Sequence, residues 1–279
     1  SGDAGATRAA GTAGASGVPA AAGAGVRIGL IDAGVETLHP LLRDASIRAW
    51  GCGGTKIPSA HGTAIASLLV GRADRFRSAA PSATLYAADV YCDDPIGGSI
   101  EAVAAALAWL IGEQVQVVNI SLVGPPNRAL ALVVRRAAAR GVLLVAAVGN
   151  DGPAAAPLYP AACPEVIAVT AVDARGQVLP EAGRGPHVAF AAPGSDMAAA
   201  AIGDTPYATP RGTSFAAPLV AGLIANALQR PDATVSQAVA ALARTAIDAG
   251  APGRDVVYGH GVVGRELRTD PAVVMARRR

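Results

Sequence analysis

Short, unbroken runs of apolar residues recur along the chain, separated by polar segments and turn residues. The first run, VRIGLI at 26–31, shows no polar alternation, which is typical of a strand buried on both faces of a sheet. Similar, largely apolar runs follow at 83–91, 115–121, 141–148, 165–172 and 187–193. These runs predict the strands of a central sheet.

Between several of these runs, apolar residues recur at helical spacing. The segment 127–140 is the clearest, because Leu130, Val134 and Ala137 share one face and the arginines lie elsewhere. Further helices are predicted at 61–71, 99–112, 213–229 and 235–246, with a late strand pair near 255–263. Strands that alternate with helices predict an α/β fold with a mostly parallel sheet covered on both faces. Functional groups in such folds gather at the carboxyl ends of the strands.

The 279 residues divide into three parts by composition. Residues 1–25 include 17 alanines or glycines without apolar periodicity, so we expect a flexible linker or leader remnant there. Residues 26–270 are predicted to form one folded domain, which carries all the predicted strands and helices. The basic end at 271–279 is predicted to be a solvated tail.

Composition narrows the classes of function. Hydrophobic residues make up 52% of the chain and aromatic residues only 4%, so alanine, valine, leucine and isoleucine must build the core. A net charge of +2 argues against a nucleic-acid-binding protein. Apolar runs stay shorter than the roughly 18–20 residues of a membrane span. The three cysteines, Cys52, Cys92 and Cys163, lack C-x-x-C spacing, which makes a zinc site improbable and leaves their pairing open.

Three polar residues stand where strands end or helices begin. Asp32 follows the first apolar run, where an aspartate commonly forms a turn. His61 opens a helical segment, and a lone histidine there is more often structural. Ser214 stands at a helix entry in GTSFAAPLVAG, with Pro218 placed as suits the first turn. Taken alone, Ser214 or its neighbour Thr213 is an ordinary helix cap.

Together, Asp32, His61 and Ser214 are the groups that an acyl-transfer site requires. A serine attacks, a histidine takes its proton, and an aspartate orients the imidazole and stabilises its cation. Their order along the chain, Asp then His then Ser, is the order found in subtilisin. The set therefore favours a nucleophilic Ser214 over a capping one.

These motifs resemble those of the subtilisin-like serine proteases. IDAGV around Asp32, HGT at His61 and GTSFAAP around Ser214 match the family, as do VVNISLVGP at 117–125 and AAVGN, which ends at Asn150. The matches keep the family's order over residues 26–263 and imply its three-layer fold. The resemblance also implies that Asn150 donates to the oxyanion, whereas the residues alone allow a turn-forming role.

The resemblance further implies that a protein or peptide substrate binds as an extended strand. The segments that would receive it are Gly97-Gly98 and Ser121-Leu122-Val123-Gly124, although the two glycines also suit an ordinary turn. The first specificity pocket would lie between residues 122–124 and Ala147, Val148 and Gly149. Val123 stands where the family usually has glycine, so we expect a narrowed pocket that prefers a small residue such as alanine or serine.

The loop after the His61 helix departs from the family pattern. Many relatives carry an asparagine-rich calcium loop there, whereas this chain has Arg72, Arg75 and Arg77 around the single carboxylate of Asp74. Calcium takes about 6–8 oxygen ligands. We therefore expect that calcium site to be missing and no cofactor to be required, with structural calcium elsewhere left open.

The resemblance bears on the cysteines as well. Cys52 and Cys92 fall in regions that approach each other beside the family's substrate groove, which implies a Cys52–Cys92 disulfide and an unpaired Cys163. A disulfide fits an extracytoplasmic location, either secreted or periplasmic.

The predicted activity is that of a serine endopeptidase, expected as a monomer. One alternative is a transpeptidase or macrocyclase that passes the same acyl-enzyme to an amine, but no segment between 26 and 263 resembles the lid such enzymes carry. The other is a non-catalytic binding module. Such proteins usually lose a triad residue, whereas this chain keeps all three.

Overall fold

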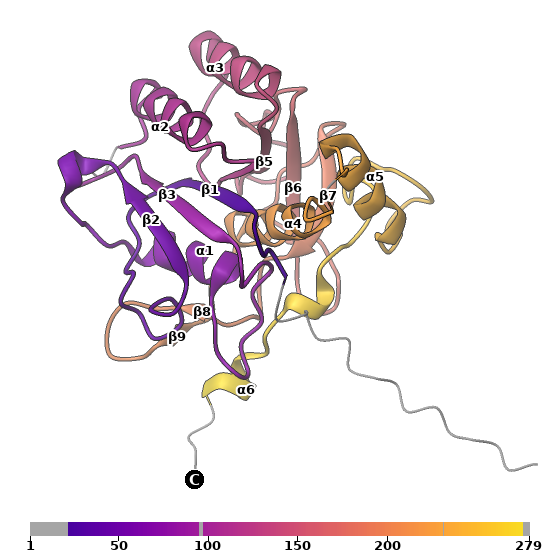
Figure 1. The fold of residues 1–279 in the computed structure, drawn as a ribbon. Helices are drawn as coiled ribbons and strands as arrows, with labels where there is room; N and C mark the ends of the chain where they lie inside the picture. The colour runs from indigo at the N-terminus through magenta and orange to yellow at the C-terminus, as the bar shows by residue number, and fades with distance from the viewer. Residues whose placement is uncertain (1–21, 95–96, 231, 276–279) are drawn as a thin grey trace, which may run out of the picture.

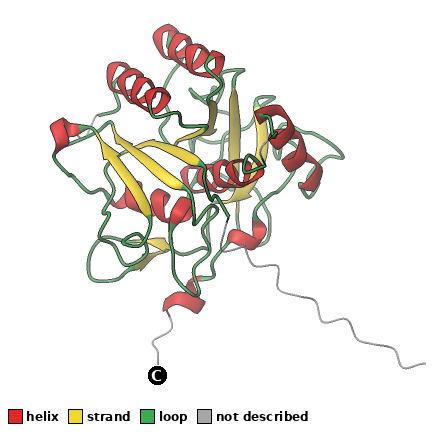
Figure 2. Cartoon of the chain, viewed as in Figure 1, coloured by secondary structure: helices red, strands yellow, loops and turns green. Residues whose placement is uncertain are grey.

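A central parallel sheet organises the molecule. The computed structural model describes residues 22–94, 97–230 and 232–275, so the predicted linker at 1–25 lies mostly outside the described residues. The part of the predicted tail that is described, residues 271–275, forms a short helix instead, and its Val274 packs against the core. Within the described residues, seven strands form one sheet in the order β2-β3-β1-β4-β5-β6-β7, with all neighbours parallel (Figures 1 and 2). The strands are β1 (Arg27–Asp32), β2 (Ser46–Trp50), β3 (Thr84–Asp89), β4 (Val117–Ile120), β5 (Leu143–Ala147), β6 (Val166–Val172) and β7 (Val188–Pro193). A separate antiparallel pair joins β8 (Ala199–Ala200) to β9 (Tyr207–Ala208).

Helices cover both faces of this sheet and give the three layers expected. They are α1 (Ala60–Val70), α2 (Ile100–Gly112), α3 (Arg128–Ala139), α4 (Thr213–Ala227), α5 (Val235–Thr245) and α6 (Pro271–Met275), with short 3₁₀ turns at Cys52–Gly54 and Arg265–Leu267. Ile28 and Leu30 of β1 belong to the core that includes α1 and α4, whereas Ile31 belongs to the core that includes α2 and α3. Successive strand residues point to opposite faces, so β1 contributes to both cores. No helix in the described part of the chain is long and apolar enough to cross a membrane.

Side-chain caps define where four of the helices begin. Ser59 accepts from the His61 N–H at the start of α1, and Ser99 accepts from the Ala102 N–H at the start of α2. Asn127 caps α3, and Thr234 opens α5 with a capping box. Helix α4 is different, because its N-cap residue is Gly212, which has no side chain to offer.

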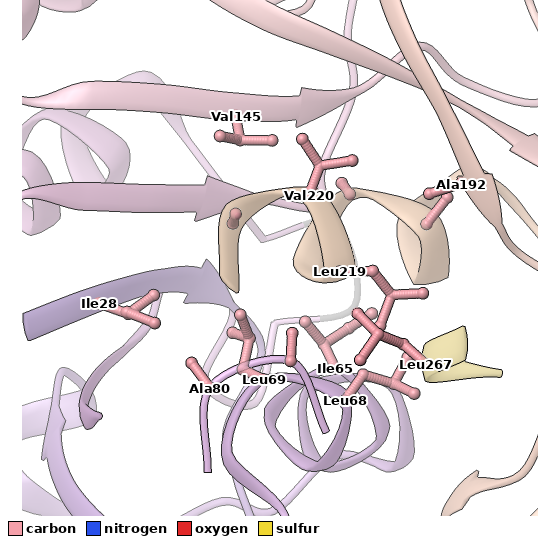
Figure 3. Packing of buried hydrophobic residues seen from close by; sticks show 14 of the residues in the cluster. Ile28, Ile65, Leu68, Leu69, Ala80, Val145, Ala192, Leu219, Val220 and Leu267 are labelled. Carbon is pink, nitrogen blue, oxygen red and sulfur yellow. The ribbon is translucent and has the colours of Figure 1, made fainter. Parts of the chain in front are cut away.

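Helix α4 lies at the centre of the fold, with ten of its 15 residues buried. It packs against β4, β5, β6 and β7 on one side and against α1 on the other. Figure 3 shows Leu219 and Val220 of α4 between Leu68 of α1 and Val145 of β5. The helix is therefore apolar around most of its surface, and the amphipathic stripe of a surface helix is absent from its sequence.

Two expectations about the elements were wrong. The segment predicted as a strand pair near 255–263 forms turns with isolated bridges such as Asp255 with Gly259, because its glycines interrupt the ladder. Strand β2 went unpredicted, since it lies at the sheet edge and carries no continuous apolar run. The other predicted strands and helices are present, with ends that differ by up to two residues.

Replacing Leu219 with alanine tests how far the fold depends on the burial of α4. Leu219 is fully buried, and truncating a buried leucine leaves a cavity that costs about 2–5 kcal/mol. We expect Leu219→Ala to lower the free energy of unfolding, measured by denaturant titration, by that amount. Leu132→Ala on α3 is the control. Leu132 is 44% exposed, so a comparable loss there would contradict the central place of α4.

Candidate active site

The candidate site residues lie at the carboxyl ends of adjacent strands. In the order β3-β1-β4-β5, the described residues that follow the strands are 90–94 with 97–98, 33–34, 121–124 and 148–150, and Asp32 is the last residue of β1. Helices α1 and α4 pack on the same face and bring His61 and Ser214 to this edge (Figure 1). Parallel strands end together, and this is why segments far apart in sequence meet here.

Asp32 and His61 are joined by a short hydrogen bond. His61 Nδ1 lies 2.8 Å from Asp32 Oδ1, which also accepts from the Ala33 N–H at 2.7 Å. The Asp32 side chain is 2% exposed and that of His61 39%. In the described residues, Asp32 Oδ2 is buried without a hydrogen-bond partner. The carboxylate is thus held mainly by the imidazole and one backbone N–H, while the other ring nitrogen of His61 is left for a reacting group.

This pairing sets the protonation of His61. Burial by itself lowers the pKa of His61, but the hydrogen bond to Asp32 and the negative charge of Asp32 outweigh burial, and the pKa is raised above its ordinary value. A buried carboxylate favours the cationic imidazolium, because opposite charges attract strongly where water is scarce. The geometry therefore suits a histidine that gains a proton during a reaction.

A glycine allows α1 to come this close. A Cβ placed on Gly62 would lie 2.1 Å from the Ala33 carbonyl oxygen and 2.7 Å from that of Gly34. No larger residue fits there, so the glycine of HGT is what permits the first turn of α1 to rest on the segment after β1. His61, its neighbour, can then reach Asp32.

Ser214 is the second residue of α4 and does not cap the helix, because the helix begins at Thr213 with Gly212 as its N-cap. Pro218 lies in the second turn, beyond the first turn predicted for it. Proline has no N–H, so the carbonyl of Ser214, four residues earlier, loses its helical partner. The Ser121 hydroxyl donates to that carbonyl instead, at 3.1 Å. The Ser214 hydroxyl itself makes a long contact of 3.5 Å to the Ser121 carbonyl oxygen.

The bond from Ser121 is oriented by a buried neighbour. Asn119 Nδ2 donates to Ser121 Oγ at 2.8 Å. The hydroxyl oxygen of Ser121 is then an acceptor for Asn119, and its proton is directed to the Ser214 carbonyl. This chain of contacts ties the end of β4 to the first turn of α4.

Asn150 is hydrogen-bonded to Thr213, the first residue of α4. The Thr213 N–H donates to Asn150 Oδ1 at 3.0 Å, and the Gly149 N–H donates to Thr213 Oγ1 at 3.1 Å. Since a backbone N–H can only donate, the amide oxygen of Asn150 faces the helix, and its NH₂ group remains free to donate elsewhere. Ser214 and Asn150 are therefore presented side by side.

The predicted pocket walls are brought together, and a residue missed by sequence analysis lies between them. Gly124 and Tyr159 exchange two backbone hydrogen bonds of 2.9 Å each, which places residue 158 beside the 122–124 segment. A Cβ on Gly149 would lie 2.4 Å from Leu158 Cδ1, so the Leu158 side chain rests directly on the Gly149 backbone. Val123, in contrast, is 44% exposed. Leu158 was missed because its place beside residues 122–124 arises from the pairing of Gly124 with Tyr159, across more than 30 residues of chain.

Gly97 and Gly98 lie on the far side of β1, after β3. The Gly98 N–H donates to the Val90 carbonyl at 2.8 Å, and both glycines contact Tyr91. Burial, and then the negative charge of Asp32, raise the pKa of Tyr91. Tyr91 was also missed, although its position just after a strand end could have signalled it.

The expected disulfide is present beside this loop. Cys52 and Cys92 are bonded, and Cys163 is buried as a free thiol. Among the described residues, the potential metal-ligand atoms of Cys52, Asp89 and Cys92 lie close together in space. The disulfide, however, occupies both sulfur atoms of this group.

Known proteins share this fold and sequence pattern. Residues 23–261 match the Peptidase S8 model, the subtilase family. Subtilisin BL of Lederbergia lenta is 34% identical over 256 residues, which are 88% of this chain and 91% of that protein. The minor extracellular protease Epr of Bacillus subtilis (strain 168) is 31% identical over 260 residues, 91% of this chain and 40% of Epr. The crystal structure of a lanthipeptide protease superposes with a TM-score of 0.74 at 25% identity, covering 90% of this chain and 87% of that one.

The chain belongs to the subtilase family, and this places it among the serine proteases. It spans less than two thirds of the length of the first curated relatives, 40% of Epr and 65% of subtilisin E of Bacillus subtilis (strain 168).

The proton affinity of His61 can be tested with Asp32→Asn. Asparagine removes the negative charge, so burial should dominate and the pKa of His61 should fall from above to below its ordinary value of about 6.5. Histidine NMR signals followed against pH measure this shift. His39 is the internal reference, since burial lowers its pKa and its contacts do not involve Asp32.

The same raised pKa links His61 to folding. The imidazolium adds stability below the unfolded pKa of about 6.5, and that contribution disappears as the pH rises through the folded pKa. An unchanged His61 titration in Asp32→Asn would contradict the role assigned to the carboxylate.

Proposed function

We propose that this chain is a serine endopeptidase that acts through Ser214, His61 and Asp32, with Asn150 in the oxyanion hole. The observation that carries the proposal is the 2.8 Å bond between His61 and the buried Asp32, at the same sheet edge where α4 presents Ser214 beside Asn150. Membership of the subtilase family supports it.

In the proposed reaction, Ser214 Oγ attacks the carbonyl carbon of the scissile peptide bond while His61 Nε2 takes the hydroxyl proton. Asp32 stabilises the resulting imidazolium. Asn150 Nδ2 and the Ser214 backbone N–H donate to the tetrahedral oxyanion. The C–N bond then breaks and His61 protonates the leaving amine. A water molecule, deprotonated by His61, releases the acid product and restores Ser214.

For this cycle the Ser214 hydroxyl must turn from Ser121 toward His61. Its contact with the Ser121 carbonyl is long, and hydrogen bonds of catalytic groups often tighten only when substrate is bound. The free amide NH₂ of Asn150 needs no such movement, because Thr213 already holds its oxygen. The oxyanion donors are thus set before substrate arrives.

Substrate, location and cofactor follow from the same site. A polypeptide is proposed to bind as an extended strand between residues 97–98 and 121–124. The Cys52–Cys92 disulfide and the extracellular relative Epr support an extracytoplasmic location. The proposed steps use protein groups alone, so we propose an enzyme that needs no cofactor and works as a monomer.

Labelling with a fluorophosphonate probe tests the proposed nucleophile. The wild type should be labelled on Ser214, including in EDTA, and Ser214→Ala should not be labelled. Asn150→Ala should keep slow labelling and lose about 10²–10³ in kcat, the loss known for the corresponding asparagine of subtilisin.

Labelling of Ser214→Ala at the wild-type rate would overturn the assignment. The mass of the product from a peptide substrate separates two outcomes. Addition of water supports hydrolysis, whereas a product joined to an amine supports the transpeptidase alternative.

We propose that the enzyme prefers a small residue before the scissile bond, and that Leu158 sets this preference. Leu158 reaches from the Tyr159 strand pairing onto Gly149, between the two walls of the predicted pocket. A large substrate side chain would have to displace it from packed surroundings, which costs free energy. Sequence analysis suggested that Val123 narrows the pocket, but Val123 is 44% exposed to solvent.

The pair Leu158→Gly and Val123→Gly separates the two residues. Leu158→Gly should raise kcat/KM for phenylalanine substrates relative to alanine substrates by about tenfold or more, since a filled apolar pocket is worth roughly 1–3 kcal/mol per methylene-sized group. Val123→Gly should change the ratio little. A wild type that already cleaves after phenylalanine as well as after alanine would refute the small-residue preference. A larger change in the ratio for Val123→Gly than for Leu158→Gly would show that Val123 sets the preference.

A further inference from the structure

A groove lined by arginines lies outside the proposed active site. It is a hollow of about 1080 Å³ between the loop after α1, residues 71–82, and the segment 268–273 that leads into α6. Its charged lining residues are Arg72, Arg75, Arg77 and Arg268 with Asp74 and Asp270. We call this feature the arginine groove.

The two walls of the arginine groove are fixed to each other and to the fold. The Arg77 backbone N–H donates to Thr269 Oγ1 at 2.8 Å, which joins the walls. Arg72 Nε donates to the Pro81 carbonyl at 2.6 Å across the base of the loop. The Arg268 guanidinium donates to the Asp196 carbonyl at 2.5 Å. The bonds from Arg72 and Arg268 use only part of each guanidinium, and the Arg77 bond uses its backbone N–H, so the groove is preformed and retains free donors.

Most of the positive charge of the groove is not paired with carboxylates. The Asp196 carboxylate beside Arg268 does have a lowered pKa, chiefly from the Ser195 hydrogen bond and in smaller part from the charge of Arg268. Within the described residues, none of its four arginines has a carboxylate oxygen within 4.0 Å, whereas Arg48 and Arg211 elsewhere pair with Glu113 and Glu181. Arg75 and Arg77 donate no side-chain hydrogen bond in that part of the chain. The lining carries a net charge of +2.

The arginine groove is distant from the catalytic residues. Its loop follows the end of α1, and His61 stands at the beginning of that helix. Eleven helical residues at 1.5 Å each separate the two ends by about 16 Å. Residues 81 and 82 of the groove lead into the first residue of β3, so the groove opens at the amino edge of the sheet, opposite the carboxyl edge that holds Asp32. It is therefore a separate site.

We propose that the arginine groove binds an acidic segment of a polypeptide. Guanidinium groups match carboxylates through paired hydrogen bonds, and free ones at a preformed surface favour an anionic partner. Asp74 and Asp270 would repel a polyphosphate, which carries a charge on every repeat, whereas a peptide can set neutral or basic residues against them. Val273, 46% exposed at the rim, offers apolar contact to a peptide side chain.

Peptide binding to the full chain carrying Ser214→Ala tests the proposal without cleavage. The probe is a fluorescein-labelled peptide rich in glutamate and leucine, read by fluorescence anisotropy. It should bind, and more weakly at about 200 mM than at about 50 mM salt, because screening weakens charge pairing. Adding Arg75→Gln and Arg77→Gln should weaken binding about tenfold or more, as expected when two charge-assisted contacts are lost.

The matched control removes Arg128 and Arg136 instead, two exposed arginines of α3, by the same change to glutamine. It should leave the affinity nearly unchanged. Equal weakening by both double variants, or equal binding of a peptide with glutamine in place of glutamate, would overturn the proposal. So would groove-dependent binding of inorganic polyphosphate that exceeds peptide binding. Unchanged thermal melting of the Arg75→Gln and Arg77→Gln variant confirms that its fold is intact.

Discussion

The entry of α4 into the core depends on hydrogen bonds that its own sequence cannot supply. Gly212 offers no side-chain cap, and Pro218 removes the helical partner of the Ser214 carbonyl. Both deficits are met from the ends of neighbouring strands, by Asn150 after β5 and Ser121 after β4. A buried polar group without a partner costs free energy, so these contacts fix where the helix begins. The same contacts place Ser214 and orient Asn150, which joins the stability of the core to the geometry of the site.

Burial by itself disfavours the charged forms of Asp32 and His61, and the contact between the two side chains offsets this effect. The Asp32 carboxylate is almost fully buried with one oxygen lacking a partner among the described residues, an arrangement that is unfavourable for stability alone. The pairing raises the pKa of His61 against the effect of burial. The arrangement is therefore better explained by the proposed proton transfer than by its contribution to the fold. Gly62 makes it possible by letting α1 rest on the backbone after β1.

The fold and much of the candidate site could be predicted from the pattern of apolar residues and from short motifs in the sequence. Strands buried on both faces leave continuous apolar runs, and five of the helices had recognisable starts or apolar faces. Edge strand β2 leaves no such run, and the glycines near 255–263 break a ladder that its apolar residues suggested. Pro218 was placed one turn too early, because the Ser214 carbonyl that it leaves without a helical partner accepts a hydrogen bond from Ser121 of a distant segment instead. The Cys52–Cys92 bond was implied by family resemblance, since spacing left the pairing open.

The sequence by itself determined the class of fold, the family and the chemical identity of the candidate triad, because periodicity and short motifs are local properties of the chain. Only the tertiary structure decided what surrounds those residues. The pairing of Gly124 with Tyr159 places Leu158, which rests on Gly149, beside residues 122–124. The arginines after α1 form a groove only with residues nearly 200 positions later. Contacts of this kind depend on which strands are neighbours and how helices pack upon them, and those are set by burial of the whole core.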